Sequence, residues 1–288
     1  MTEPTRPRRS ALYLPAANSR AIDKARTLAA DAVILDQEDS VAPEAKREAR
    51  TLACEAVRAG GFGGREVVVR VNGLDTPWGE EDLEAAAAAG PDAVLIPKIA
   101  APDEIAEAAR IVAGRTRLWA MIETCQAMFR LDALGAASAA HGVDVWVIGG
   151  NDLVKEMRCR PGPDRAPLLP ALAMSVMAAR AHGLAILDGV YNEIPNLEGL
   201  AAECAQGAAF GFDGKSLIHP SHLEIANRAF TPPAEEVAWA RTVVAAYGLA
   251  ENADKGVLKV EGRMVERLHL TQARRLIGVA DAIAARGG

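Results

Sequence analysis

The sequence is poor in aromatic residues, paired cysteines and long apolar runs, and each shortage excludes a class of protein. Only 4% of its 288 residues are aromatic. The four cysteines lie far apart without a CxxC pair, which argues against a disulfide framework or a zinc finger. No stretch reaches the roughly 18 apolar residues that span a membrane, and the apolar run near the basic start is too short for a signal peptide. We therefore expect a cytoplasmic protein without a membrane partner.

Positive charge is scarce as well. The sequence has 32 Lys and Arg against 38 Asp and Glu, which gives a formal net charge of −6. Binding to nucleic-acid phosphates needs a basic face, so we expect no nucleic-acid partner. The motifs GxSxG, GxxxxGK[ST] and GxGxxG are absent, and serine hydrolases, P-loop NTPases and Rossmann enzymes therefore lack support.

Eight short apolar runs alternate with Ala-rich helical segments. Most runs are continuously apolar, as expected of parallel strands that are buried on both faces. An Asp opens three of them, in the similar stretches AADAVIL, GPDAVLI and GVDVWVI. Eight strand–helix units predict an α/β protein with a (β/α)8 TIM barrel, and an open doubly wound sheet is the alternative. The runs cover residues 10–16, 32–39, 66–72, 93–99, 117–124, 143–150, 184–190 and 210–218.

A Thr-Pro-Pro segment closes this repeat and divides the chain into two predicted domains. Residues 1–231 form the TIM-barrel domain, and residues 232–288 form a C-terminal helical lid subdomain. Its helices are expected at about 233–248 and 270–286, joined by a connector at 251–265. Two helices of this size cannot form an independent core, so they are expected to bury their apolar faces on a barrel.

The active site of a TIM barrel lies at the carboxyl ends of the strands. Nearly every run ends in a charged residue, and acids gathered in a pocket repel one another unless a cation compensates. Glu123 and Asp152 end adjacent runs and are candidate ligands of a hard divalent cation. Two solvated strand-end acids are the alternative. The residues ending the runs are Asp36, Glu38, Asp39, Arg70, Asn72, Lys98, Glu123, Asn151, Asp152, Asp188, Asp213 and Lys215.

Three further positions suggest contacts with a substrate. They belong to the rim of the barrel that the carboxyl ends of the strands form. Arg70 follows an apolar run, so its guanidinium would be partly desolvated and suited to a bidentate grip on a carboxylate. An internal salt bridge to Glu38 or Asp39 is the alternative. Gly150 and Asn151, in Gly-Gly-Asn-Asp, offer unhindered backbone N–H groups beside the candidate metal.

Lys98 could form a Schiff base in a barrel aldolase, although a lysine among acids is more often a counter-charge. His219 and His222, in IHPSH, resemble a metal pair, but their spacing favours capping or packing.

Taken together, these motifs resemble the HpcH/HpaI aldolase/citrate lyase superfamily, in particular its citrate-lyase beta-subunit-like and malyl-CoA lyase-like branch. The resemblance extends from Arg9 to about Ile283. Its carriers are RSALYLPAANSRAIDKA, ADAVILDQEDSVAPEAK, VVVRVNGLDTPWGEEDL, AVLIPKI, MIET, VIGGNDLVKEM, LDGVYNEI and GFDGKSLIHPSH.

The resemblance implies a barrel with a C-terminal lid and Mg²⁺, with Mn²⁺ as an alternative ion. It also implies reversible carbon–carbon cleavage of a 3-hydroxy-3-carboxyacyl-CoA thioester, such as malyl-CoA, methylmalyl-CoA or citramalyl-CoA, to a 2-keto acid and an acyl-CoA. By motif, Glu123 and Asp152 become the metal ligands, and Arg70 grips the substrate and stabilises developing negative charge. Glu38 and Asp39 would orient Arg70 and water on the metal.

The same resemblance assigns roles to two more residues. Arg9 becomes a candidate contact for the phosphates of CoA, with a solvated arm as the alternative. Glu266 stands where lyase relatives carry an Asp that acts as catalytic acid or base across a subunit interface. This implies a homotrimer or a homohexamer, while the longer side chain moves the acid by about an ångström. A second departure is Gln37, where Leu is common.

Three alternatives remain for the reaction. A malyl-CoA-type thioesterase would use the same pocket but activate water. A non-CoA barrel aldolase would act on pyruvate, and a binding protein would have lost catalysis, although the complete set of acids with Arg70 argues against such a loss.

Overall fold

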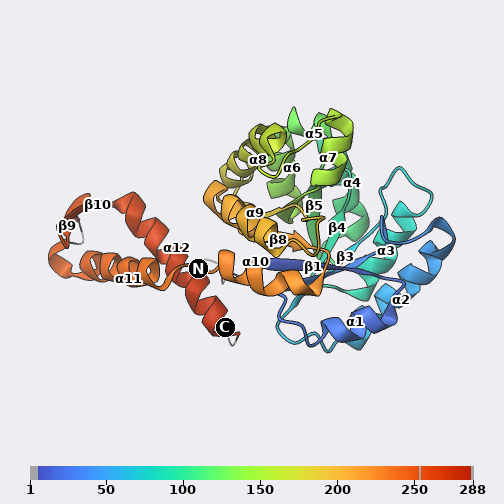
Figure 1. Cartoon of the computed structure of the whole chain (residues 1–288), viewed down its shortest axis with the longest axis horizontal. Helices are drawn as coiled ribbons and strands as arrows, with labels where there is room; N and C mark the ends of the chain where they lie inside the picture. Colours follow the sequence, from blue (N-terminus) through green and yellow to red (C-terminus); the bar gives the residue numbers. More distant parts are fainter. Residues whose placement is uncertain (1–5, 253, 287–288) are drawn as a thin grey trace. The chain divides into compact units, whose positions relative to one another are not determined.

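The chain folds into two compact units. The computed structural model describes residues 6–252 and 254–286. The larger unit runs from Arg8 to Phe230, and the smaller contains Arg6, Pro7 and the described residues from Thr231 onward (Figure 1). The outermost positions of the two predicted domains, 1–5 and 287–288, lie outside the described residues.

The larger unit is a closed barrel of eight parallel strands. Each strand pairs with the next in sequence, and β8 pairs with β1, which closes the sheet. The predicted (β/α)8 barrel is therefore confirmed, and the open-sheet alternative is wrong. The strands are β1 (Ser10–Pro15), β2 (Ala32–Asp36), β3 (Glu66–Arg70), β4 (Ala93–Ile96), β5 (Arg117–Ile122), β6 (Val143–Ile148), β7 (Ala185–Asp188) and β8 (Gly214–Leu217).

Two apolar layers hold this barrel together. A cluster that includes Ile34, Trp119 and Leu187 contains residues of the barrel sheet without any from the helices, and it fills the interior. Leu35 and Trp146 belong to the larger layer between the strands and the surrounding helices. Strands with two buried faces explain the continuous apolar runs.

Helices follow the strands and cover the outside of the barrel (Figure 1). They are α1 (Ser19–Ala25), α2 (Lys46–Ala59), α3 (Gly79–Ala89), α4 (Pro102–Val112), α5 (Cys125–Met128), α6 (Leu131–His141), α7 (Gly150–Met157), α8 (Leu169–Ala181), α9 (Leu197–Phe210) and α10 (Leu223–Ala229), with 3-10 turns η1 (Pro43–Ala45), η2 (Ala166–Leu168) and η3 (Pro220–His222). Alanine is common in many of these helices, including α3, α6 and α9.

A repeated aspartate links neighbouring strands at the amino end of the barrel. Each of these aspartates lies at the start of an even-numbered strand and accepts a hydrogen bond from the start of the odd-numbered strand before it. This explains the Asp in the three similar stretches of the sequence, and it adds a fourth. The pairs are Asp31 with the Arg9 N–H, Asp92 with the Val67 N–H, Asp144 with the Arg117 guanidinium and Asp213 with the Ile186 N–H.

The smaller unit contains two helices and a hairpin: α11 (Ala234–Gly248), the turn η4 (Ala250–Asn252), β9 (Val257–Val260), β10 (Arg263–Glu266) and α12 (Arg267–Ala284). The predicted plain connector is wrong, since β9 and β10 pair antiparallel. The turn between them has Glu261 at φ +47° and Gly262 at φ +83°, and two positive φ angles suit a tight two-residue hairpin turn.

This hairpin gives the C-terminal unit an apolar core of its own. Leu258, Val260 and Val265 of the hairpin pack with Val243 and Tyr247 of α11. The hydroxyl of Tyr247 also lies 2.9 Å from the carbonyl oxygen of Val265, to which it donates. The prediction that this segment cannot form an independent core is therefore wrong, because it counted the helices alone.

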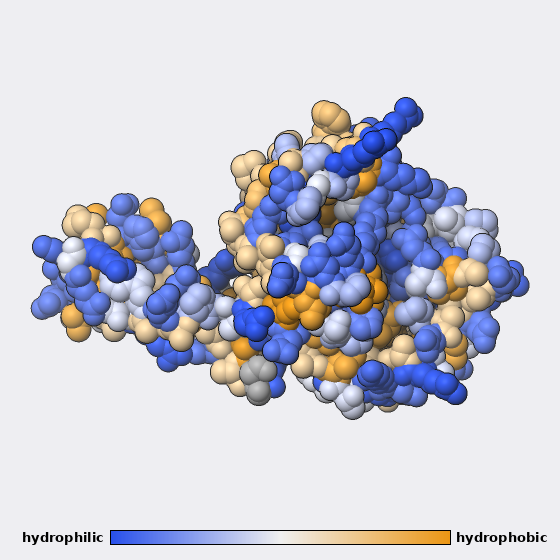
Figure 2. Space-filling model, in the orientation of Figure 1, coloured by the Kyte–Doolittle hydropathy of each residue, from blue (hydrophilic) through white to orange (hydrophobic). Residues whose placement is uncertain are grey.

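None of the helices in the described part of the chain combines the length and the apolarity that crossing a bilayer requires. Hydrophilic side chains cover much of the face that Figure 2 shows, with apolar ones between them.

Candidate active site

Arg70 and Asp36 form the centre of the candidate site. They end β3 and β2 at the same level, since the parallel register pairs Asp36 with Arg70. Nε of Arg70 lies 2.6 Å from Oδ1 of Asp36, and Nη2 lies 2.8 Å from Oδ2. The guanidinium thus grips the carboxylate through two parallel hydrogen bonds, and both side chains are buried.

Asp36 also organises the segment that follows β2. Its carboxylate accepts hydrogen bonds from the N–H of Glu38 at 2.9 Å and from the N–H of Ser40 at 3.1 Å. Burial by itself would raise the pKa of Asp36, but the charge and the hydrogen bonds of Arg70 outweigh it and hold that pKa below its usual range. An ionised Asp36 therefore fixes both Arg70 and the turn.

The other edge of Arg70 faces two more carboxylates and an aromatic ring. Nη1 lies 2.9 Å from Oε2 of Glu38 and 3.4 Å from Oδ2 of Asp39. The centre of the guanidinium lies 4.7 Å from the ring centroid of Tyr13. The internal salt bridge that the sequence left open is present. Burial would lower the pKa of Arg70, but the carboxylate of Asp36 above all, together with Tyr13 and Glu38, outweighs it and raises that pKa.

Sequence reasoning named Asp36 only as a strand end and missed it as the main partner of Arg70. The signal was available in the register, because the last residues of two adjacent parallel strands lie side by side. Glu38 and Asp39 attracted attention instead since they follow the strand and were expected to reach the site from its rim.

Glu38 bridges Arg70 and Lys98, whose ammonium forms an ion pair with its second carboxylate oxygen. Burial raises the pKa of Glu38 in spite of these cations. The contact with Glu38 in turn raises the pKa of Lys98, although burial opposes it. A Schiff-base lysine needs a lowered pKa, so the geometry favours Lys98 as a counter-charge.

Glu123 directly follows β5 and is 1% exposed. Its Oε1 accepts a hydrogen bond from the N–H of Lys98 at 2.7 Å, while its Oε2 is buried and has no hydrogen-bond partner among the described residues. A Cβ at Gly149 would lie 2.1 Å from Oε2, so only glycine fits there. Burial, with Glu38 and Asp152 nearby, raises the pKa of Glu123 to about 8.

Asp152 does not end β6 as predicted. That strand stops at Ile148, and Asp152 lies in the first turn of α7, where the N-terminal end of the helix favours a negative charge. It is partly exposed, and it raises the pKa of Glu123 through its charge. The two predicted ligands therefore lie in one region of the rim, one buried and one partly exposed.

This pair fits a divalent cation. The partnerless oxygen of Glu123 offers a ligand that only a cation or a proton would satisfy, and Asp152 supplies a second carboxylate. Throughout the described ranges, no group of three or more His, Cys, Asp or Glu side chains could hold a metal ion. A hard cation at the pair would therefore complete its shell with water and substrate oxygens.

Gly150 and Asn151 lie on the same rim, at the start of α7. A Cβ at Gly150 would meet no atom within 4 Å, so its backbone is open to a ligand. The exposed Asn151 exchanges side-chain hydrogen bonds with Asn192, at 2.7 and 3.3 Å, and thereby joins the start of α7 to the loop after β7.

The prediction that Arg9 contacts CoA phosphates needs correction. Arg9 precedes β1, at the amino end of the barrel, whereas the candidate site lies at the carboxyl ends of the strands. Its side chain is buried and paired with Asp31, with Nε 2.9 Å from Oδ2 and Nη2 3.0 Å from Oδ1. The residue belongs to the aspartate links that join neighbouring strands.

Two of the charges predicted at strand ends form a separate network, in which Asp188 ends β7 but Lys215 is the second residue of β8. Lys215 and Asp188 are both 0% exposed, and their side chains meet at 2.9 Å. Glu203 of α9 and Arg165 complete the network at 2.6 Å from Lys215 and 2.8 Å from Asp188. Because Glu203 belongs to a surrounding helix, these charges lie outside the barrel interior and are not part of the candidate site.

His219 and His222 have separate roles. His219 caps η3 by accepting a hydrogen bond from the N–H of Ser221, and Nε2 of His222 lies 3.1 Å from the carbonyl oxygen of Ile194. Capping and packing, the favoured interpretation, describe both.

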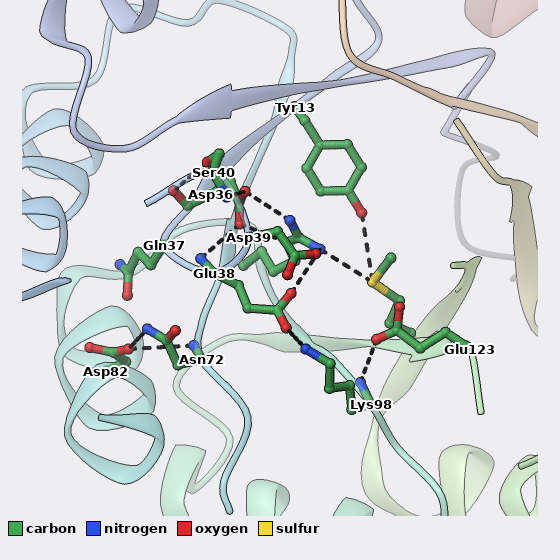
Figure 3. Close-up of polar contacts among 12 residues, drawn as sticks. Tyr13, Asp36, Gln37, Glu38, Asp39, Ser40, Asn72, Asp82, Lys98 and Glu123 are labelled. Carbon is green, nitrogen blue, oxygen red and sulfur yellow. Dashed lines mark hydrogen bonds and ion pairs between the residues drawn. The ribbon is translucent and has the colours of Figure 1, made fainter. Parts of the chain in front are cut away.

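Gln37 is a buried amide without a partner. Its side chain is 0% exposed, and neither Nε2 nor Oε1 has a hydrogen-bond partner in the part of the chain that the structure describes. In Figure 3 it points away from the carboxylate of Glu38. A buried unpaired amide costs about 1–3 kcal/mol. We expect Gln37→Leu to raise the free energy of unfolding by about this amount in urea titrations, and a decrease would contradict the missing partner.

The chain matches a known family over most of its length. Residues 9–220 match the family model of HpcH/HpaI aldolase/citrate lyase. The chain belongs to this family. The resemblance carried by the sequence motifs is thereby confirmed, and membership explains the barrel with its charged carboxyl-end rim.

Individual relatives of this family member extend over nearly the whole chain. It is 46% identical over 285 residues to the (3S)-malyl-CoA thioesterase of Cereibacter sphaeroides, with 99% of each chain covered. It is 33% identical to the citrate lyase subunit beta of Escherichia coli, covering 96% of this chain and 94% of that one. Among solved structures, the protein CitE from Mycobacterium tuberculosis in complex with magnesium, acetoacetate and coenzyme A is 31% identical, with a TM-score of 0.75, covering 94% of this chain and 97% of that one.

Proposed function

We propose that this family member is a metal-dependent enzyme that hydrolyses a malyl-CoA-type thioester. Water adds to the thioester carbonyl, the carbon–sulfur bond breaks, and the products are a hydroxydicarboxylate and CoA. The observation that carries the metal-dependent chemistry is the buried, partnerless oxygen of Glu123 beside Asp152. The thioester is supported by the thioesterase relative with 46% identity and by the relative bound to magnesium and coenzyme A.

In the proposed site, some residues would bind the metal ion and others would bind the substrate. Glu123 and Asp152 would hold Mg²⁺, or Mn²⁺ in its place, which when bound would polarise a substrate oxygen. Arg70, kept cationic by three carboxylates, would grip the substrate and offset negative charge that develops on it. The open backbone at Gly150 and the amide of Asn151 would orient a substrate carboxylate.

The affinity for the metal should depend on pH through Glu123. Its pKa in the folded protein is raised from the usual 4.5 to about 8, so the metal-free protein favours the protonated form below that pH. A proton then competes with the ion, and we expect Mg²⁺ affinity to rise up to about tenfold per pH unit between about pH 6 and 8 and to level off above. Titration calorimetry measures this. Affinity that stays constant across the range would contradict it.

Carbon–carbon cleavage of the same substrate, to a 2-keto acid and an acyl-CoA, is the second candidate. The citrate lyase relative of 33% identity favours it, and so does the complete set of rim acids with Arg70. Hydrolysis ranks first because Glu266, the predicted lyase acid, carries an extra methylene. Its backbone N–H donates to Nδ1 of His269 at 2.9 Å, which ties Glu266 to the first turn of α12.

Product analysis separates these reactions. The protein is incubated with Mg²⁺ and malyl-CoA, methylmalyl-CoA or citramalyl-CoA, and the products are identified by mass spectrometry. Free malate with CoA supports hydrolysis, whereas glyoxylate or pyruvate with an acyl-CoA supports the lyase. Thermal stabilisation by pyruvate but not by acetyl-CoA would favour the non-CoA aldolase and contradict both.

We also propose that the protein is a homotrimer or a homohexamer in which Glu266 approaches a neighbour's barrel. The C-terminal unit has an apolar core of its own, so the proposed assembly does not follow from the lack of one. The exposed apolar side chains of that unit support the assembly, with Met264 at 70%, Leu249 at 53% and Leu268 at 52% exposure. Light scattering coupled to size exclusion should give three or six copies, and Met264→Lys with Leu268→Lys should lower that number. A monomeric parent would contradict the proposal.

A further inference from the structure

Lys46 makes an unusual contact with the backbone beside the candidate site. It begins α2 and is only 6% exposed. Its ammonium donates hydrogen bonds to two successive carbonyl oxygens, that of Gln37 at 2.9 Å and that of Glu38 at 2.7 Å. Burial lowers the pKa of Lys46 in spite of nearby carboxylates. Removing an ammonium from water costs free energy, and among the described residues no carboxylate forms a direct ion pair with Lys46. Its two hydrogen bonds to carbonyl oxygens therefore need an explanation.

The same ammonium reaches a second loop. It lies 5.6 Å from the ring centroid of Trp78, which directly precedes α3 in the segment after β3. One side chain thus connects the loop after β2 with the loop after β3. These two loops follow the strands that end in Asp36 and Arg70.

Both sides of the peptide backbone around Glu38 are therefore fixed. The carboxylate of Asp36 accepts the N–H of Glu38, and Lys46 binds the carbonyl oxygens of Gln37 and Glu38. The side chain that leaves this backbone contacts Arg70 and Lys98. Any rotation of the two peptide groups would shift the Glu38 carboxylate away from both cations.

We propose that Lys46 is a positioning residue that holds the backbone at Gln37 and Glu38, so that Glu38 keeps Arg70 and Lys98 in their working geometry. Its kinetic consequence rests on the proposed function, but the restraint on the backbone does not. A shift of about 1 Å in a catalytic arrangement can reduce a rate by about 100-fold. Lys46 acts through Glu38 and need not touch the substrate.

The test uses Lys46→Met, which keeps the apolar stem and removes the donors. Its matched control is Arg65→Met, because Arg65 also binds two backbone carbonyls, those of Leu28 at 2.5 Å and Phe62 at 2.9 Å, but at the amino end of the barrel. We expect Lys46→Met to lower kcat about 10- to 100-fold with KM within threefold, and Arg65→Met to leave both within twofold. A kcat within threefold of the parent for Lys46→Met would overturn the proposal.

A double-mutant cycle separates positioning from general destabilisation. If Lys46 acts through Glu38, Lys46→Met should cost less than about threefold in kcat once Glu38→Gln is present. Full multiplication of the two losses would mean that Lys46 acts elsewhere. Should Lys46→Met fold poorly, Lys46→Arg keeps donors for the carbonyls and should retain at least a tenth of the parent kcat. A greater loss for that folded variant would count against the proposal.

Hydrogen exchange tests the restraint without any substrate. Peptides covering residues 37–41 should exchange at least about tenfold faster in Lys46→Met, while those covering 117–122 stay unchanged in both variants. Unchanged exchange at 37–41 would overturn the proposal even in an active enzyme. Faster exchange in a protein that turns over none of the thioesters would reject the proposed function and leave the positioning role intact.

Discussion

Replacing Glu123 by Gln or Asp152 by Asn is expected to abolish turnover while the fold stays intact. Each change removes one charge at nearly constant volume. The buried Oε2 of Glu123, which has no hydrogen-bond partner among the described residues, is the proposed ligand of the cation. We expect a loss of at least about 1,000-fold in kcat/KM, measured by release of CoA, because the polarising ion is lost. Chelation with EDTA should inactivate the parent, and Mg²⁺ or Mn²⁺ should restore it.

The control for this pair is Asp132→Asn. Asp132 lies on α6, its side chain is 98% exposed, and its carboxylate lies 3.0 Å from Nε2 of His182. That variant should keep the parent rate, and circular dichroism should show the same fold for all three. Full activity in an exhaustively chelated sample would reject the metal site.

Arg70→Lys is expected to lower the rate by at least about 100-fold. Lysine keeps the charge but loses the planar fork that binds both oxygens of Asp36 and still reaches Glu38. The positive charge would then be free to move, and a preorganised group of this kind is worth about 100- to 1,000-fold in rate. Steady-state kinetics with the substrate identified by product analysis provide the measurement.

Arg8→Lys is the matched control for Arg70→Lys. Arg8 forms an equivalent two-bond pair with Glu66, with Nε 2.6 Å from Oε2 and Nη2 2.8 Å from Oε1, at the amino end of the barrel. Its replacement should reduce stability without a comparable loss of rate. If Arg70→Lys stays within a factor of three of the parent, Arg70 has only a structural role.

The sequence carried enough information to predict the barrel but not the direction in which each strand residue points. Continuous apolar runs reveal buried strands, yet they lack the polar alternation that distinguishes the interior from the helix-facing side. Arg70 and Lys215 both lie on buried strands, but Arg70 belongs to the candidate site, whereas Lys215 pairs with Glu203 of α9. Only the register and the surrounding helices separate the two.

Other differences come from contacts between distant segments. Arg9 was predicted to contact CoA phosphates, with a solvated arm as the alternative, but it binds Asp31, 22 positions away. The hairpin after α11 was overlooked because Glu-Gly is a weaker turn signal than Asn-Gly, although the flanking strands alternate as expected. The family resemblance supplied the two candidate metal ligands, but it could not indicate that Asp152 lies in a helical turn.

The four aspartate links at the amino end have a consequence for how this chain can change. They join the strands in four pairs, namely β1 with β2, β3 with β4, β5 with β6 and β7 with β8. These hydrogen bonds stabilise the barrel at its amino end, opposite the candidate site, and none of them involves a loop at the carboxyl end. We therefore expect that the loops at the carboxyl ends of the strands can change in length or sequence while these strand pairs keep their alignment.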